Sequence, residues 1–185
     1  MKLETTLNAI RDLKPCAYGW ETLLRGLGKT KADDKPLHLL EILEINGIAD
    51  ALWCLRCWPE YSLWWQLLAA RFARDVWHLM FDERSRRAVE AAEMHSFGQE
   101  TDEELFALMI SAKHAAWDAA AVAGILPGVH AARAASSAAG CDAKAAARSA
   151  RSTGAVSEYV QAKTLRDMIA EMERCGTGRP TREAA

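Results

Sequence analysis

The chain has 185 residues, a formal net charge of −2 at pH 7 and seven tryptophans. This length is typical of one domain that buries a core without metals or disulfides. The slight negative charge argues against a general nucleic-acid binder, which usually carries a basic surplus, and is too small for an acidic mimic of DNA. No run of about 18 apolar residues is present, which argues against a membrane span, and the first residues lack the apolar core of a signal peptide. We therefore expect a cytoplasmic protein.

Apolar residues recur at helical spacing throughout the first half of the chain. Asp33 and Asp34, just ahead of Pro36, are predicted to cap one helix, and Asn46-Gly47 is predicted to end it in a left-handed C-cap. No segment sustains the alternation of apolar and polar residues that a strand requires, so no strand is predicted. The helices predicted in this half cover residues 3–13, 20–27, 37–45, 48–57 and 62–80.

The second half of the chain also reads as helical. Asp82 is predicted to cap a helix over 83–95, and a Thr101–Glu104 capping box is predicted to start one that runs to about residue 123, before Gly124. Nearly half of residues 115–150 are alanine, and Gly140 divides this segment into two thin predicted helices. A last amphipathic helix is predicted over 155–175. Its expected inner face is Tyr159, Ala162, Leu165, Met168 or Ile169, and Met172.

These segments predict an all-α fold, an irregular bundle of about eight helices. We expect a single helical domain over residues 1–175. Its core part, 18–124, is rich in tryptophan, and the Ala-rich and C-terminal helices of 125–175 form a layer on it. The polar residues 176–185 are expected to be a flexible tail. Close alanine-mediated contacts suit a homodimer without requiring one.

The segment DALWCLRCW, residues 50–58, contains Cys54 and Cys57 in C-x-x-C spacing. Structural zinc needs four ligands, but the nearest histidines, His38 and His78, belong to no H-x(3–5)-H pair. A thioredoxin-type pair begins a helix after a strand, whereas this pair comes late in a predicted helix. We therefore favour thiols in a helical core, with a metal or redox role as the alternatives. All five cysteines are expected to be free, and we predict no metal site and no cofactor.

No segment of the chain carries a complete catalytic motif. GLGKTK, residues 26–31, resembles part of a phosphate-binding loop, but that pattern needs a glycine where Leu23 stands, a strand before it and a helix after it. No Ser-His-Asp set, paired carboxylates or glycine-rich nucleotide motif stands out. We therefore predict no catalytic residue and a protein that is not an enzyme.

A basic stripe is the best candidate for a binding surface, because its side chains would share helix faces and suit phosphates or an acidic protein surface. The alternative is internal pairing with nearby acids, namely Asp75, Asp82, Glu83, Glu90 and Glu93. Trp20, Trp64 and Trp117 are candidate exposed anchors, with core packing as the alternative. The predicted partner-binding residues are Arg71, Arg74, His78, Arg84 and Arg87, with Arg86 beside them.

Two stretches carry a family resemblance. DALWCLR and RFARDVWHLMFDERSRRAVEAAEMHSFGQETDEELFA, followed by the Ala-rich segment, resemble a family of small helical bacterial and phage proteins labelled as immunity proteins. The likeness covers roughly residues 18–124 and is most specific from Val76 to Leu105. It implies a protein that binds and neutralises another protein without catalysis. No functional residue is carried over with it.

Three classes of function follow, and the absence of catalytic signatures disfavours the third, an enzyme whose residues gather from distant helices. The first is a non-catalytic protein-binding inhibitor, either an immunity protein that neutralises a toxin or a phage-encoded, anti-CRISPR-type inhibitor of a bacterial defence complex. The second is a nucleic-acid-binding regulator that uses the arginine-rich helix face, for which affinity should fall steeply with salt. The resemblance favours the first class and the negative net charge disfavours the second.

Overall fold

The structure of the protein, a computed structural model, describes residues 2–123, 127–176 and 178–181. Its contacts divide the chain into two compact units, Met1–Glu60 and Tyr61–Ala185, which we describe separately. The prediction of one helical domain over 1–175 stays a prediction. Gly124 and much of the expected flexible tail lie outside the described residues.

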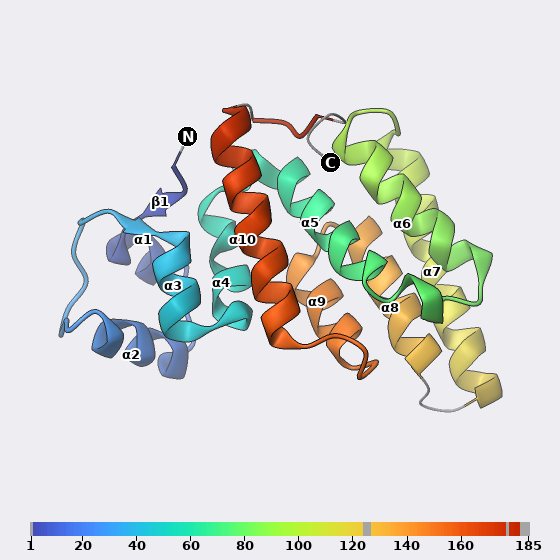
Figure 1. Ribbon diagram of the computed structural model, residues 1–185, viewed down its shortest axis with the longest axis horizontal. Coiled ribbons are helices and arrows are strands. Elements are labelled where there is room, and N and C mark those ends of the chain that lie inside the picture. The colour runs from blue at the N-terminus through green and yellow to red at the C-terminus, as the bar shows by residue number, and fades with distance from the viewer. Residues whose placement is uncertain (1, 124–126, 177, 182–185) are drawn as a thin grey trace. The chain divides into compact units, whose positions relative to one another are not determined.

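The prediction of an all-α fold is confirmed, with ten α-helices among the described residues instead of about eight (Figure 1). In the first unit these are α1 (Leu7–Asp12), α2 (Ala17–Gly26), α3 (Leu39–Asn46) and α4 (Ile48–Cys54). In the second unit they are α5 (Ser62–Arg74), α6 (Glu83–Ser96), α7 (Asp102–Ala123), α8 (Pro127–Ala139), α9 (Ala143–Arg151) and α10 (Glu158–Cys175).

The absence of strands was predicted wrongly, because the first unit contains a short antiparallel pair. Strand β1 (Glu4–Thr5) pairs with β2 (Leu37–His38), so that Thr5 faces Leu37. These residues were expected to begin two helices. The pairing of two segments far apart in the sequence leaves no local signal, since a two-residue strand is too short to alternate. It allows Leu3 and Leu37 to be buried together at the start of the core.

The start of α3 also differs from its prediction. Asp33 and Asp34 do not cap it; His38 does, accepting a hydrogen bond at Nδ1 from the Leu40 amide at 3.1 Å, and Glu41 completes a capping box. Asp33 instead accepts a hydrogen bond from Lys29 Nζ, which lowers its pKa. Gly47 ends α3 with a positive φ of 79°, but its ψ of 179° lies outside the left-handed helical region.

The C-x-x-C segment packs into the first unit with Cys54 buried, as predicted, and Cys57 half-buried. Leu52, Cys54 and Leu55 are buried, and buried Trp58 donates its indole N–H to the Glu4 carbonyl at 3.2 Å. All five cysteines carry free thiols. Among the described residues, no group of three or more His, Cys, Asp or Glu side chains is placed to hold a metal ion.

Helix α5 ends earlier than predicted. The helix expected to reach Met80 stops at Arg74, and a short 3-10 helix, Trp77–Leu79, follows. No glycine or proline occurs between Arg74 and Asp82, so the sequence carries no local stop signal. Instead the Arg74 guanidinium stacks on the Trp77 ring, with its Cζ atom 4.0 Å from the ring centre. Val76 and Met80 are buried in the core. His78 therefore does not share a helix with Arg71 and Arg74.

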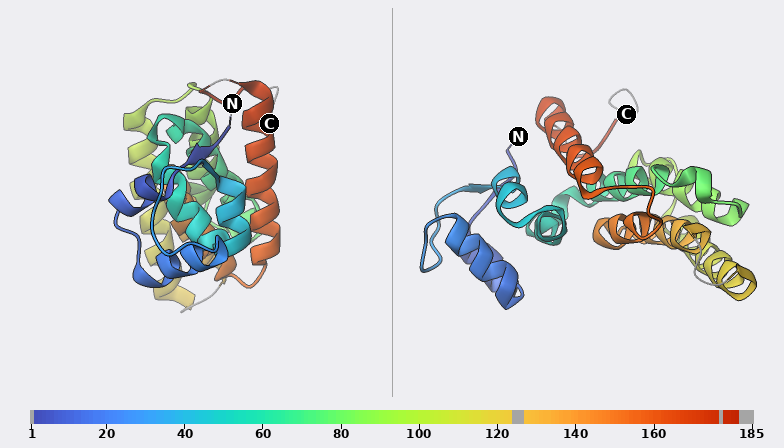
Figure 2. Two further views of the ribbon diagram at one scale, coloured as in Figure 1. Left: turned by 90° about the vertical axis from the view of Figure 1, so that its left-hand side faces the viewer. Right: turned by 60° about the horizontal axis from the view of Figure 1, so that its bottom comes forward.

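The second unit is organised around α8. Helices α7, α8 and α9 lie side by side, and α5 and α6 pack across the same side of this row, while α10 contacts α5 (Figure 2, right). As predicted, Gly140 separates two alanine-rich helices, and their alanines allow this close packing. The buried alanines are Ala131, Ala132, Ala134, Ala135, Ala138, Ala139, Ala143, Ala146, Ala147 and Ala150.

Helix α10 matches its predicted inner face only in part. Leu165, Met168 and Met172 are buried, but Tyr159 is exposed. The buried position in the first turns is taken by Gln161, which donates its side-chain amide to the Ala147 carbonyl at 2.7 Å. None of the described helices is both long enough and apolar enough to span a membrane.

Candidate functional site

The predicted basic stripe is largely held by ion pairs within the second unit. Arg71, on α5, contacts Glu171 of α10 with Nη2 and Oε2 2.9 Å apart, and Glu171 is buried. Arg74 makes two hydrogen bonds to Glu93 of α6, at 2.7 and 2.6 Å, which raise its pKa. Both guanidiniums are therefore engaged in joining α5 to neighbouring helices.

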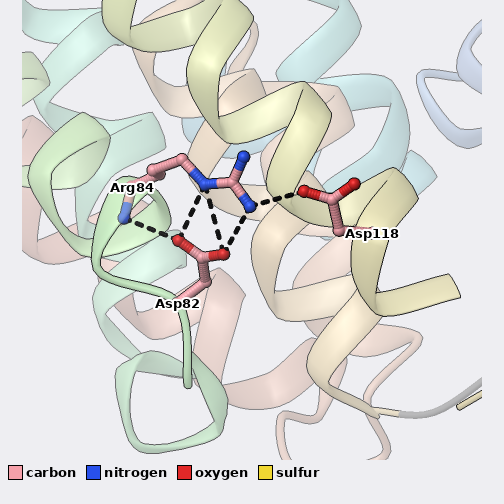
Figure 3. A network of polar contacts seen from close by, with 3 residues as sticks. All are labelled: Asp82, Arg84 and Asp118. Carbon is pink, nitrogen blue, oxygen red and sulfur yellow. Dashed lines mark hydrogen bonds and ion pairs between the residues drawn. The ribbon is translucent and has the colours of Figure 1, made fainter. Parts of the chain in front are cut away.

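Arg84 lies at the centre of a third pairing (Figure 3). Its guanidinium contacts both carboxylate oxygens of Asp82 and reaches Asp118 of α7 at 2.6 Å. Asp82 also accepts the Arg84 backbone amide at 2.9 Å and caps α6, as predicted. These contacts raise the pKa of Arg84, and the bond from Arg84 lowers that of Asp82.

Arg87 and His78 complete the predicted set. Both are exposed, and neither has a hydrogen-bond or ion-pair partner among the described residues. The internal-pairing alternative thus describes Arg71, Arg74 and Arg84. Two of the pairing acids, Asp82 and Glu93, had been expected from their sequence positions, whereas Asp118 and Glu171 come from distant helices. Whether any of the five residues binds a partner stays a prediction.

A row of apolar side chains lies on the outer side of α7. Phe106, Ile110 and Trp117 follow one another at spacings of four and seven residues, which places them on one helix face. Phe106 is 62% exposed and Trp117 is 67% exposed, while Ile110 is half-buried. We call these three residues the α7 row. It extends over roughly 16 Å of helix, at about 1.5 Å per residue.

A groove of about 390 Å³ lies beside Trp117. Its lining residues come from α7, α8 and α9. Two of its lining residues, Lys113 and Arg133, are exposed cations without an ion-pair partner among the described residues, and no carboxylate is among the lining residues that the structure describes. The lining consists of Lys113, Ala116, Trp117, Arg133, Ser136, Ser137 and Ser149.

A second depression, of about 310 Å³, lies on the other side of α7. Exposed Phe81 forms part of its rim, and Asp82 and Asp118 line it together with small apolar residues. Ser85 is fully buried there, with a hydroxyl that has no hydrogen-bond partner among the described residues. The C-terminal part of α7 therefore separates a mainly apolar depression from a basic groove.

Only one residue of this surface was singled out from the sequence. Of the three candidate tryptophan anchors, Trp117 is exposed, Trp20 is half-buried and Trp64 is fully buried, so Trp64 is excluded as a surface anchor. Phe106 and Lys113 were missed. A local signal existed, because α7 carries large apolar residues opposite its buried Leu105 as well as beside it.

Comparisons with protein-family models, with curated proteins and with solved structures found no match. The resemblance of residues 18–124 to immunity proteins therefore stays a prediction.

Proposed function

We propose that the protein is a non-catalytic inhibitor that acts by binding another protein through the outer face of α7. The observation that carries this proposal is the α7 row, in which Phe106 and Trp117 are more than half exposed with Ile110 between them. Large aromatic side chains are enriched at the centres of protein interfaces, where they supply most of the binding energy. A row of this length suits the side of a partner helix or strand.

The α7 row favours a protein partner over a nucleic acid. Nucleic-acid surfaces consist largely of phosphate and sugar, which do not complement the side chains of Phe106 and Ile110. Three of the arginines that would have contacted phosphates, Arg71, Arg74 and Arg84, are neutralised by carboxylates. The net charge of −2 also opposes general attraction to a polyanion.

The resemblance is compatible with two kinds of inhibitor. An immunity protein would bind a toxin, and a phage-encoded inhibitor would bind a bacterial defence complex of the CRISPR type. Both require a stable surface that excludes water around a few anchoring side chains, which is what the α7 row offers. The identity of the captured partner separates the two.

The second candidate is a nucleic-acid-binding regulator. One observation favours it: Lys113 and Arg133, which have no ion-pair partner among the described residues, line the same groove as the exposed Trp117. Cations that track a backbone, next to an aromatic ring on which bases stack, are the usual elements of single-strand binding. The arginine face offers less for this role, because only Arg86 and Arg87 on it lack an ion pair among the described residues.

A pull-down from host lysate tests the proposal. Tagged wild-type protein is compared with Ile110→Asp, Trp117→Ala and the surface control Lys31→Glu, with and without nuclease, and bound proteins are identified by mass spectrometry. We expect one stoichiometric, nuclease-resistant partner that is lost with Ile110→Asp, weakened at least tenfold with Trp117→Ala and retained by the control. Circular dichroism confirms that each variant is folded.

Two results would overturn the proposal. Recovery of nucleic acid alone, removed by nuclease, would favour the regulator. Light scattering that finds a dimer of this chain, dissociated by Ile110→Asp, would identify the occupant of the α7 row as a second copy and remove the argument for an inhibitor.

A further inference from the structure

We infer that the groove beside Trp117 receives an acidic segment of the partner protein, an inference that rests on the proposed function. In this arrangement carboxylates of the segment pair with Lys113 and Arg133, and an apolar side chain of the same segment packs on Trp117. The volume of about 390 Å³ lies in the range of about 300–1,000 Å³ common for ligand sites. It suits a few side chains rather than a whole helix.

Uncompensated charge is the first argument. Three arginines of the second unit that contact other helices are matched by carboxylates: Arg71 by Glu171, Arg74 by Glu93, and Arg84 by two aspartates. Lys113 of α7 and Arg133 of α8 line one groove and have no such match among the described residues. Their field is unopposed within the described lining, and it would attract and orient a complementary acidic segment.

Neutral hydrogen-bond donors are the second argument. Three serines, Ser136, Ser137 and Ser149, line the same groove. Ser136 already donates its hydroxyl to the Met109 carbonyl at 3.3 Å. The hydroxyls of Ser137 and Ser149 have no partner among the described residues, so each can donate to a carboxylate oxygen that the cations bring in.

The surroundings of Trp117 decide between an acidic peptide and a nucleic-acid strand. Its ring centre lies 5.6 Å from that of His114, with an angle of 35° between the ring planes, so His114 is its aromatic neighbour on α7. Along α7 the surface continues to Ile110 and Phe106 instead of to further cations. A nucleic-acid strand requires a continuous basic track, whereas a peptide with acidic and apolar residues complements both parts.

A display library of short random peptides, selected on the immobilised full-length protein, tests the inference. We expect enriched peptides to carry an acidic surplus and at least one aromatic or aliphatic residue. A fluorescein-labelled peptide from this pool should bind Lys113→Glu and Arg133→Glu at least tenfold more weakly than wild type, and Lys31→Glu, a charge reversal at an exposed lysine of the first unit, equally well. Neutral variants, Lys113→Gln and Arg133→Gln, should give smaller losses and guard against misfolding caused by charge reversal.

The possible results separate this inference from the proposed function. Enriched peptides that are apolar without acidic surplus, and that lose binding to Ile110→Asp but not to Arg133→Glu, would overturn the groove inference and leave the α7 row as a protein-binding face. Binding of labelled oligo(dT), abolished by Arg133→Glu, in the absence of any enriched peptide would overturn both in favour of the nucleic-acid regulator. Failure to enrich any acidic peptide overturns the groove inference in every case.

Discussion

Arg71 of α5 and Glu171 of α10 form an ion pair between residues one hundred positions apart, with Glu171 6% and Arg71 22% exposed at the side chain. Removing one member leaves the other charge poorly hydrated and without its partner, which strongly destabilises the folded state. We predict that Glu171→Ala lowers the free energy of unfolding by about 2–3 kcal/mol. A double-mutant cycle measures the coupling between the two residues: the free energy of unfolding in urea is determined for Arg71→Met, Glu171→Leu and the double variant. The double variant should lose less than the sum of the single losses; strict additivity would contradict the prediction.

Asp82 both caps α6 and pairs with Arg84, and two substitutions separate these roles. Asp82→Asn keeps an oxygen that accepts the Arg84 amide, whereas Asp82→Ala removes it. We predict that Asp82→Ala lowers the free energy of unfolding by about 1 kcal/mol more than Asp82→Asn does. The ion pair itself is solvent-exposed and should contribute little. Thermal unfolding followed by circular dichroism measures the difference, and equal losses would show that the cap contributes nothing.

Asp75 should make stability depend on pH. Burial raises the pKa of its carboxyl, and one oxygen has no hydrogen-bond partner among the described residues. Arg71 and Arg74 line the same small pocket, but Glu171 and Glu93 engage them. The folded state therefore binds this proton more tightly than the unfolded state, so the stabilisation is present at low pH and lost as pH rises through the folded-state pKa.

The Asp75→Asn variant checks this sign. It should be more stable than wild type at pH 7, and the advantage should shrink as the pH is lowered toward the pKa of an unfolded aspartate, near 3.9. Urea unfolding at a series of pH values measures both effects. If the variant is less stable than wild type at pH 7, a favourable contact of the charged Asp75 carboxylate must outweigh its desolvation.

Cys141 should react slowly with alkylating reagents. Its thiol donates to the Ser62 carbonyl at 3.4 Å, and desolvation, followed by the nearby Asp142 charge, raises its pKa to about 11. Because the thiolate is the reactive form, little of it is present at neutral pH. Iodoacetamide labelling followed by peptide mass spectrometry should modify Cys16 well before Cys141, although both residues are exposed. Equal rates at the two sites would contradict the raised pKa of the Cys141 thiol.

Trp117 should dominate the quenchable fluorescence of the protein. It is the most exposed of the seven tryptophans, so Trp117→Phe should remove the largest share of the quenching by iodide. Because Lys113 and Arg133 line the same groove as Trp117, iodide should quench its fluorescence more strongly than caesium does. Arg133→Glu should reduce iodide quenching and increase caesium quenching. Quenching that is insensitive to this substitution would mean that the groove has no local positive potential.

Local chemistry determined much of the fold. The capping box of Thr101 and Glu104, the Asp82 cap and the division at Gly140 were all predicted correctly. Each depends on residues within a few positions of one another, so the sequence contains the whole interaction. The end of α5 at Arg74 was not predictable in this way, because it follows from the packing of Trp77 and Val76 instead of from a helix-breaking residue.

The candidate site depends on long-range contacts. From sequence, Arg71 and Arg84 were as eligible for a binding surface as Arg87, because their partners Glu171 and Asp118 lie on helices far along the chain. Periodicity places a residue on a helix face, but it does not say which face another helix covers. Only the tertiary structure determines that Phe106 and Trp117 of α7 stay exposed. It also places Lys113 and Arg133 in the lining of one groove, with no carboxylate among the described lining residues.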